Sequence, residues 1–107
     1  MEFNEYQKEA IKTAFYTGDG LIYCTLGLSG EAGEFAEHVK KMLRDDNGVL
    51  TKEKKKSLIG ELGDVLWYLS VLANELDTDL ESVVEYNLNK IKSRKERGVQ
   101  KGSGDFR

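Results

Sequence analysis

The sequence predicts an all-α protein, an antiparallel four-helix bundle that assembles into an oligomer. In four stretches, apolar residues recur at the spacing of one helix face, and no useful length alternates as a strand would. The chain of 107 residues contains no proline, so long helices need no interruption. One half-helix is apolar nearly all round and needs cover on several sides, which a short four-helix monomer struggles to supply.

The first two helices are each defined by an apolar stripe and by the turn that follows it. The first is expected over residues 4–16 and is ended by Gly18-Asp19-Gly20. The second is expected over residues 21–44, because residues 45–48 read Asp-Asp-Asn-Gly, a strong turn sequence. The stripe of the second helix consists of Leu28, Phe35, Val39, Met42 and Leu43.

The third helix, expected over residues 51–76, carries the apolar half at residues 65–73. We therefore infer that it is central and lies at an interface between copies. The fourth helix opens with Thr78-Asp79-Leu80-Glu81, which is typical of a capping box. We expect residues 1–97 to form a single helical domain and the glycine-rich residues 98–107 to form a flexible tail.

The composition argues against several classes of protein. The formal net charge of −3 argues against broad binding of a nucleic-acid polymer. No stretch approaches the roughly 20 apolar residues that a membrane span needs, so we expect no membrane partner. The single cysteine, Cys24, leaves no internal disulfide and fits a reducing, cytoplasmic setting.

Two segments inside the predicted helices repeat the pattern Gly-Glu-x-Gly-acid. They are Gly30-Glu31-Ala32-Gly33-Glu34 and Gly60-Glu61-Leu62-Gly63-Asp64. The spacing of three puts both acids of each pair on one helix face, so antiparallel packing can bring four carboxylates to one point. Two carboxylates about 4 Å apart repel by about 4 kcal/mol at an effective dielectric near 20, so such a group binds protons or cations. Carboxylate ligands favour hard ions, Mg²⁺ first and Mn²⁺ as an alternative.

The glycines separate this interpretation from an ordinary solvated face. Each helical glycine costs about 1 kcal/mol relative to alanine, so the five of them cost roughly 5 kcal/mol together. These glycines are Gly27, Gly30, Gly33, Gly60 and Gly63. They flatten a helix face so that a backbone or a ligand can come close. The only histidine, His38, lies on the face of Glu31 and is either a neighbour of the site or a polar helix residue. A carboxylate-bridged di-iron bundle would need two Glu-x-x-His motifs, and the single histidine of this chain excludes that alternative.

In this context the residues resemble the MazG-like, all-α nucleoside triphosphate pyrophosphohydrolases. Residues 27–34 and 61–68 are similar to the family's two most recognisable blocks, and residues 87–94 are similar to its C-terminal block. The resemblance covers residues 21–97. It implies a helical bundle assembled as a homodimer or homotetramer. It also implies an enzyme that hydrolyses a nucleoside triphosphate to the monophosphate and pyrophosphate with Mg²⁺, in housecleaning of the nucleotide pool.

The resemblance also implies roles for particular residues. The metal ligands it implies are Glu31, Glu34, Glu61 and Asp64, and the catalytic candidates for activating water are Glu34 and Glu61. The candidates for binding substrate are Tyr68, Asn87, Lys90 and Arg94. Lys90 and Arg94 would contact phosphate, Asn87 the base or sugar, and Tyr68 the base. Core packing of Tyr68 and a solvated face of the fourth helix are the alternatives.

Two other functions also fit the sequence. A phosphoribosyl-ATP pyrophosphohydrolase would share the fold and the acid cluster, and substrate profiling would distinguish it. A non-catalytic helical interaction module would expose the acidic face and the apolar third helix to a protein partner. This module would have no tight divalent-ion site and would not be stabilised by nucleotide, so ion and nucleotide binding separate it from the enzyme.

Overall fold

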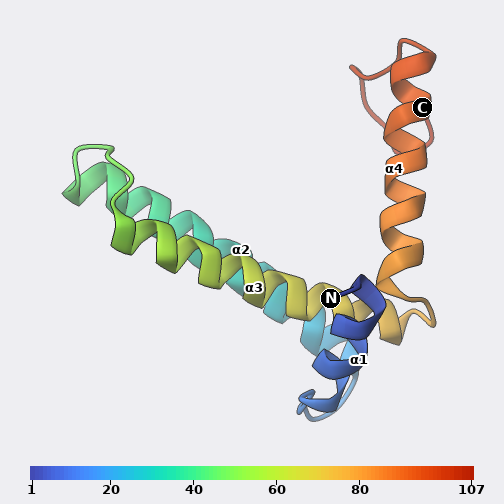
Figure 1. Cartoon of the computed structure of the whole chain (residues 1–107), viewed down its shortest axis with the longest axis horizontal. Helices are drawn as coiled ribbons and strands as arrows, with labels where there is room; N and C mark the ends of the chain where they lie inside the picture. The colour runs from blue at the N-terminus through green and yellow to red at the C-terminus, as the bar shows by residue number, and fades with distance from the viewer.

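The computed structural model describes residues 1–107 and contains four helices and no strand (Figure 1). The helices are α1 (Phe3–Lys12), α2 (Gly20–Asp45), α3 (Lys52–Glu75) and α4 (Leu80–Glu96). The all-α prediction is confirmed. None of the four helices has the length and apolar character that crossing a membrane would require.

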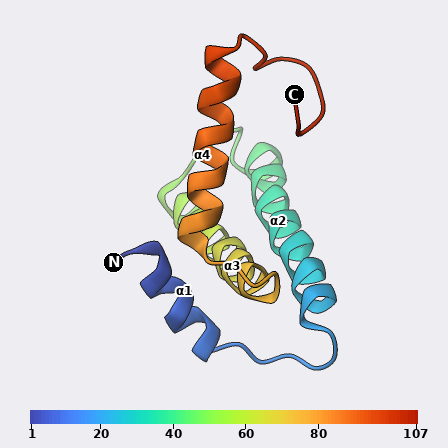
Figure 2. The same cartoon turned by 90° about the vertical axis from the view of Figure 1, so that its right-hand side faces the viewer.

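The longest helices, α2 and α3, run antiparallel as a hairpin in both views (Figures 1 and 2). The turn between them contains two residues with left-handed backbone, Asn47 at φ 54° and Gly48 at φ 75°. Helix α3 then starts at the cap residue Thr51, whose hydroxyl accepts a hydrogen bond from the Lys54 N–H at 3.1 Å. Both the stop of α2 and the start of α3 therefore fall where the polar turn sequence predicts them.

One of the five helical glycines is needed for the hairpin to close. The ring of Tyr68, on α3, occupies the space that a Cβ at Gly27 would take. A Cβ at the other four would meet nothing within 4 Å; these are Gly30, Gly33, Gly60 and Gly63. Close packing within the chain therefore accounts for Gly27 alone, and the cost of the other four needs a different reason.

Helix α1 fixes the start of α4 through a buried glutamine. Gln7 is 5% exposed, and its amide nitrogen donates to the carbonyls of Ser70 at 3.1 Å and Thr78 at 3.3 Å. Its amide oxygen accepts from the Leu80 N–H at 3.0 Å. Asn4 accepts from another N–H of the first turn of α4 at 3.1 Å. Side chains of α1 thus satisfy backbone groups that helix α4 leaves open at its N-terminus.

The four helices do not close into the expected bundle within one chain. Helix α4 contacts α1 and α3, makes no contact with α2, and projects away from the hairpin (Figure 1). The short α3–α4 turn and the Gln7 cap set this direction. Beyond the buried Leu80, four apolar side chains of α4 consequently stay 37–46% exposed; they are Val83, Val84, Leu88 and Ile91. An open apolar groove of about 330 Å³ lies where α3, α4 and the start of α1 meet.

Two helix boundaries differ from the sequence prediction. Helix α1 ends four residues early, because Thr13 turns the chain: its hydroxyl donates back to a carbonyl of α1 and accepts from the Trp67 indole N–H at 2.9 Å. The cap of α4 is Asp79 rather than Thr78. The Asp79 carboxylate accepts from the Ser82 N–H at 2.8 Å and lies one residue later than the predicted capping box would place it.

Candidate active site

Three carboxylates meet at the seam between α2 and α3. Glu31 comes from α2, and Glu61 and Asp64 come from α3; one oxygen of each lies within 4.8 Å of the others. Glu31 and Glu61 are partly buried and Asp64 is exposed. The spacing of three puts the α3 acids one turn apart on one face, and the antiparallel hairpin sets Glu31 against them. The structure therefore brings together three of the four acids in the repeated pattern.

The fourth acid, Glu34, is exposed and lies outside this cluster. Three residues along a helix amount to a rotation of about 60° away from the starting direction. Glu31 points toward α3, so Glu34 lies at the solvent edge of the hairpin. Its roles as metal ligand and as the residue that activates water stay predictions.

Without a bound cation, the negative charges of these three carboxylates repel one another. A hydrogen bond with Glu61 raises the pKa of the Glu31 carboxyl, and burial and the nearby Asp64 charge raise it further. The second oxygen of Glu61 is buried and has no hydrogen-bond partner. A buried, unpartnered carboxylate oxygen beside two other carboxylates is costly unless a proton or a cation satisfies it. Oxygen ligands in this arrangement fit a hard divalent ion such as Mg²⁺ or Mn²⁺.

The only histidine lies against this cluster. His38 Nε2 is 3.4 Å from Glu61 Oε1, and both side chains are largely buried. His38 Nδ1 is buried and has no partner. His38 follows Glu31 by two helical turns and so shares its face of α2. Of the two interpretations made from the sequence, a neighbour of the acidic site is the one that the structure shows.

Tyr68 lies one turn after Asp64 and packs in the hairpin seam. Its ring sits against Gly27 and meets the Trp67 ring edge-to-face, with centroids 5.0 Å apart. Burial raises the pKa of the Tyr68 hydroxyl, and nearby groups that include Glu31 add to this. The structure thus places Tyr68 beside the carboxylates as a packing residue, and contact with a nucleotide base stays a prediction.

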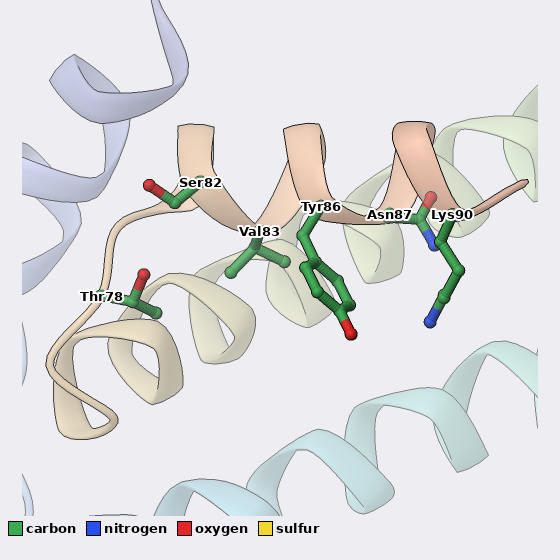
Figure 3. A pocket seen from close by; sticks show the side chains of 6 residues that line it. All are labelled: Thr78, Ser82, Val83, Tyr86, Asn87 and Lys90. Atoms are coloured by element: carbon green, nitrogen blue, oxygen red, sulfur yellow. The ribbon is translucent and has the colours of Figure 1, made fainter. Parts of the chain in front are cut away.

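The other substrate-binding candidates lie on α4. Asn87 and Lys90 line a groove of about 450 Å³, together with Thr78, Ser82, Val83 and Tyr86 (Figure 3). Tyr86 and Lys90 point to the same side of α4, and the Lys90 ammonium lies 5.5 Å from the centroid of the Tyr86 ring. Since α4 and α2 make no contact, this groove and Glu31 belong to separate parts of the chain.

Lys90 and Arg94 both bind an acid that the sequence analysis did not identify. Lys90 Nζ lies 2.7 Å from Asp105 Oδ1. Arg94 Nη2 donates to the same carboxylate oxygen at 3.2 Å and to the Asp105 carbonyl at 2.6 Å. These two cations hold the pKa of the Asp105 carboxyl below its usual value. A signal for this contact was present in the sequence, because Asp105 is the only acid in the tail.

Comparison with known families settles the ancestry of the chain. The sequence model of the MazG nucleotide pyrophosphohydrolase domain matches residues 22–99. The chain belongs to the MazG family. This MazG chain is 53% identical, over 114 aligned positions, to the Gene 37 protein of Mycobacterium phage L5, and the alignment covers all of both proteins. It is 37% identical over 78 positions to the uncharacterized protein YpjD of Bacillus subtilis (strain 168), covering 72% of this chain and 69% of YpjD. No solved structure gives a significant match.

The MazG match covers α2 from its third residue and all of α3 and α4, and it includes every candidate site residue. The family resemblance inferred from the repeated Gly-Glu-x-Gly-acid pattern is therefore confirmed. Helix α1 lies outside the matched MazG segment, although Gln7 caps α4. Membership of the family indicates nucleotide pyrophosphohydrolase activity in general terms.

Proposed function

We propose that this MazG chain is a Mg²⁺-dependent nucleoside triphosphate pyrophosphohydrolase. It would convert a ribo- or deoxyribonucleoside triphosphate to the monophosphate and pyrophosphate, in housecleaning of the nucleotide pool. The observation that carries the proposal is the meeting of the Glu31, Glu61 and Asp64 carboxylates, together with the buried, unpartnered second oxygen of Glu61. Carboxylates of an ordinary acidic surface keep their oxygens in water. In a cation site the oxygens are withdrawn from water and are free to bind the ion.

The chain's own residues would divide the work of hydrolysis. Glu31, Glu61 and Asp64 would hold the metal, and His38 beside Glu61 would fix the direction of that carboxylate. When bound, Mg²⁺ or Mn²⁺ supplies charge neutralisation of the phosphates and a more acidic coordinated water. Glu34, exposed one turn from Glu31, would accept the proton of the attacking water.

The remaining roles fall to α4 and to Tyr68. Attack at the α-phosphorus leaves the monophosphate and releases pyrophosphate, so negative charge develops on the bridging oxygen and on the leaving group. Lys90 and Arg94 would stabilise that charge by hydrogen bonds to phosphate oxygens. Asn87 would bond the sugar or the base, and Tyr68 would lie under the base.

We also propose that two copies share each active site in a homodimer or homotetramer. Within one chain the cations of α4 belong to a separate part from Glu31, because α4 and α2 do not touch. The apolar residues of α4 are exposed, and so are Leu26 (68%), Ile59 (58%) and Leu62 (56%) of the hairpin. Gly30, Gly33, Gly60 and Gly63 have open space above them, which suits the close approach of another helix. A second copy would cover these surfaces and bring Lys90 and Arg94 of one chain to the carboxylates of the other.

The activity is tested by incubating the protein with a panel of canonical and modified nucleoside triphosphates and Mg²⁺, with products resolved by chromatography. We expect monophosphate plus pyrophosphate, lost in Glu61→Gln and retained in Asp77→Asn, whose exposed side chain makes no hydrogen bond. Diphosphate plus orthophosphate would refute the proposed cleavage. Turnover of phosphoribosyl-ATP alone would show that the enzyme is a phosphoribosyl-ATP pyrophosphohydrolase and not one that acts on nucleoside triphosphates. A folded protein without any turnover or ion binding would favour the interaction module.

The shared site is tested by mixing two inactive variants. Glu61→Gln lacks a carboxylate, and the double variant Lys90→Gln, Arg94→Gln lacks the cations. If two copies share each site, refolding an equal mixture as dimers restores about a quarter of the wild-type rate, since half the dimers are mixed and each holds one intact site. A matched mixture of Glu61→Gln with Asp64→Asn should stay inactive. No restoration in the first mixture would contradict the shared site without bearing on the reaction itself.

A further inference from the structure

The last ten residues form a closed loop that lies back along α4. Figure 2 shows the tail arching outward from the end of α4 and running back beside the helix rather than continuing its axis. The loop is held by the side chain of Arg107, whose guanidinium donates three hydrogen bonds of 2.8–3.1 Å to backbone carbonyls. Their acceptors are the carbonyls of Val99, Gln100 and Gly104. Each of the three Arg107 guanidinium nitrogens donates to a carbonyl of the tail, so the loop has a defined shape of its own.

The loop carries one acidic side chain, and it sits on the two cations proposed to bind phosphate. The Asp105 carboxylate bridges Lys90 and Arg94, and the Asp105 carbonyl accepts a second bond from Arg94. The two cationic side chains are largely covered, at 24% and 11% exposed, whereas Asp105 is 57% exposed. The anion in this contact is therefore the partner that water reaches most easily.

Asp105 leaves part of the Arg94 donor set unused. Arg94 Nε is buried and has no hydrogen-bond partner. A cavity of about 190 Å³ adjoins it, lined by Ile91, Arg94, Gln100 and Arg107. One carboxylate also carries a single negative charge against two positive ones. A phosphate chain offers more oxygens and more charge than a carboxylate, so it can satisfy donors that Asp105 does not.

The geometry points to Asp105 as an internal anion that occupies the phosphate-binding pair Lys90–Arg94 and is displaced by an incoming polyphosphate, which opens the tail. This inference rests on the proposed function, because it takes these two cations as the phosphate contacts. It makes Asp105 a competitor of the substrate. The opposite arrangement, in which the folded tail is a supporting part of the phosphate site, predicts the reverse effect of removing the carboxylate charge.

The test measures binding of inorganic pyrophosphate to the full-length protein by calorimetry, with a chelator present. The chelator removes divalent ions, so no bound metal attracts the pyrophosphate and no turnover occurs, and the acidic cluster is the same in wild type and in the variant. Asp105→Asn should bind pyrophosphate about two- to fivefold more tightly than wild type, since an ion pair with a well-exposed carboxylate is weak. Asp77→Asn, a matched change at an exposed aspartate outside the tail, should bind as wild type does. Equal or weaker binding by Asp105→Asn would overturn the inference.

Opening of the tail has its own readout. Pyrophosphate should speed tryptic cleavage after Lys101, detected by mass spectrometry as release of the hexapeptide of residues 102–107. Arg94→Gln should lose this response. Protection of Lys101 by pyrophosphate would instead show that the tail closes over the anion, and would overturn the inference. Neither measurement depends on hydrolysis, so failure here and failure of the nucleotide panel are separate results.

Discussion

Replacing Glu61 by glutamine should stabilise the protein without metal and destabilise it, relative to wild type, with metal. At 4.8 Å and an effective dielectric near 20, two ionised carboxylates repel by about 3.5 kcal/mol. The cluster is only partly buried, so solvent screening leaves a net gain of about 1–3 kcal/mol. The glutamine amide can still donate to Glu31, so the shape of the seam is kept. For a chain of this size each kcal/mol raises the melting temperature by about 4–8 °C.

Thermal unfolding followed by circular dichroism, at one protein concentration, tests this reasoning. In chelator, Glu61→Gln should melt at least about 4 °C above wild type. A divalent ion at a thousand times its dissociation constant stabilises wild type by about 4.1 kcal/mol, which exceeds the gain in chelator, so the order of the two melting temperatures should reverse in Mg²⁺. Glu34→Gln makes the same chemical change at the exposed edge and should shift stability by less than about 0.5 kcal/mol. A Glu61→Gln protein that melts below wild type in chelator would refute the argument that repulsion dominates this cluster.

Three further changes have calculable effects. Gln7→Ala removes three hydrogen bonds at the α1–α4 junction and should lower the free energy of unfolding by about 1.5–4.5 kcal/mol in urea titrations. Gly27→Ala places a methyl group in the space of the Tyr68 ring and should cost about 1–3 kcal/mol in the same assay. The raised pKa of Glu31 favours the protonated carboxyl in the folded state, so protonation of Glu31 stabilises the folded protein fully below the unfolded-state pKa near 4.5. In chelator, this stabilisation should be lost as the pH rises through the raised pKa of the folded state.

Each of these predictions has a matched comparison or an outcome that would contradict it. Gln100→Ala changes a glutamine whose side chain makes no hydrogen bond, and it should be nearly neutral. A Gly27→Ala protein as stable as wild type would mean that Tyr68 is free to move out of the seam. For the pH effect, the difference in unfolding free energy between wild type and Glu31→Gln should turn against wild type between pH 4 and pH 7. A difference independent of pH would contradict the raised pKa of Glu31.

The sequence predicted the parts of the fold that depend on local signals. The turn at Asn47-Gly48 and the cap at Thr51 are short-range features, and the hairpin they join follows from them. The clustering of Glu31 with Glu61 and Asp64 was also predictable, because it needs only the helical period and an antiparallel neighbour.

The features that the sequence did not predict depend on long-range contacts. Glu34 shares the spacing of Asp64, but the rotation of α2 about its axis decides which acid faces α3, and no local signal reports that rotation. The direction of α4 is set by Gln7, more than seventy residues away in the chain. The contact of Asp105 with Lys90 depends on a loop whose shape comes from Arg107.

The position of Gln7 has a consequence for how this domain can be divided. The segment that matches the family begins at residue 22, so a fragment cut at that boundary would retain the hairpin and all the acids and cations of the site. It would lose the side chains that cap the first turn of α4, leaving the Leu80 N–H without its acceptor. The direction of the cationic helix would then be free to vary about the α3–α4 turn. The segment that carries the site residues therefore begins at residue 22, whereas the segment that holds them in one geometry must also include α1.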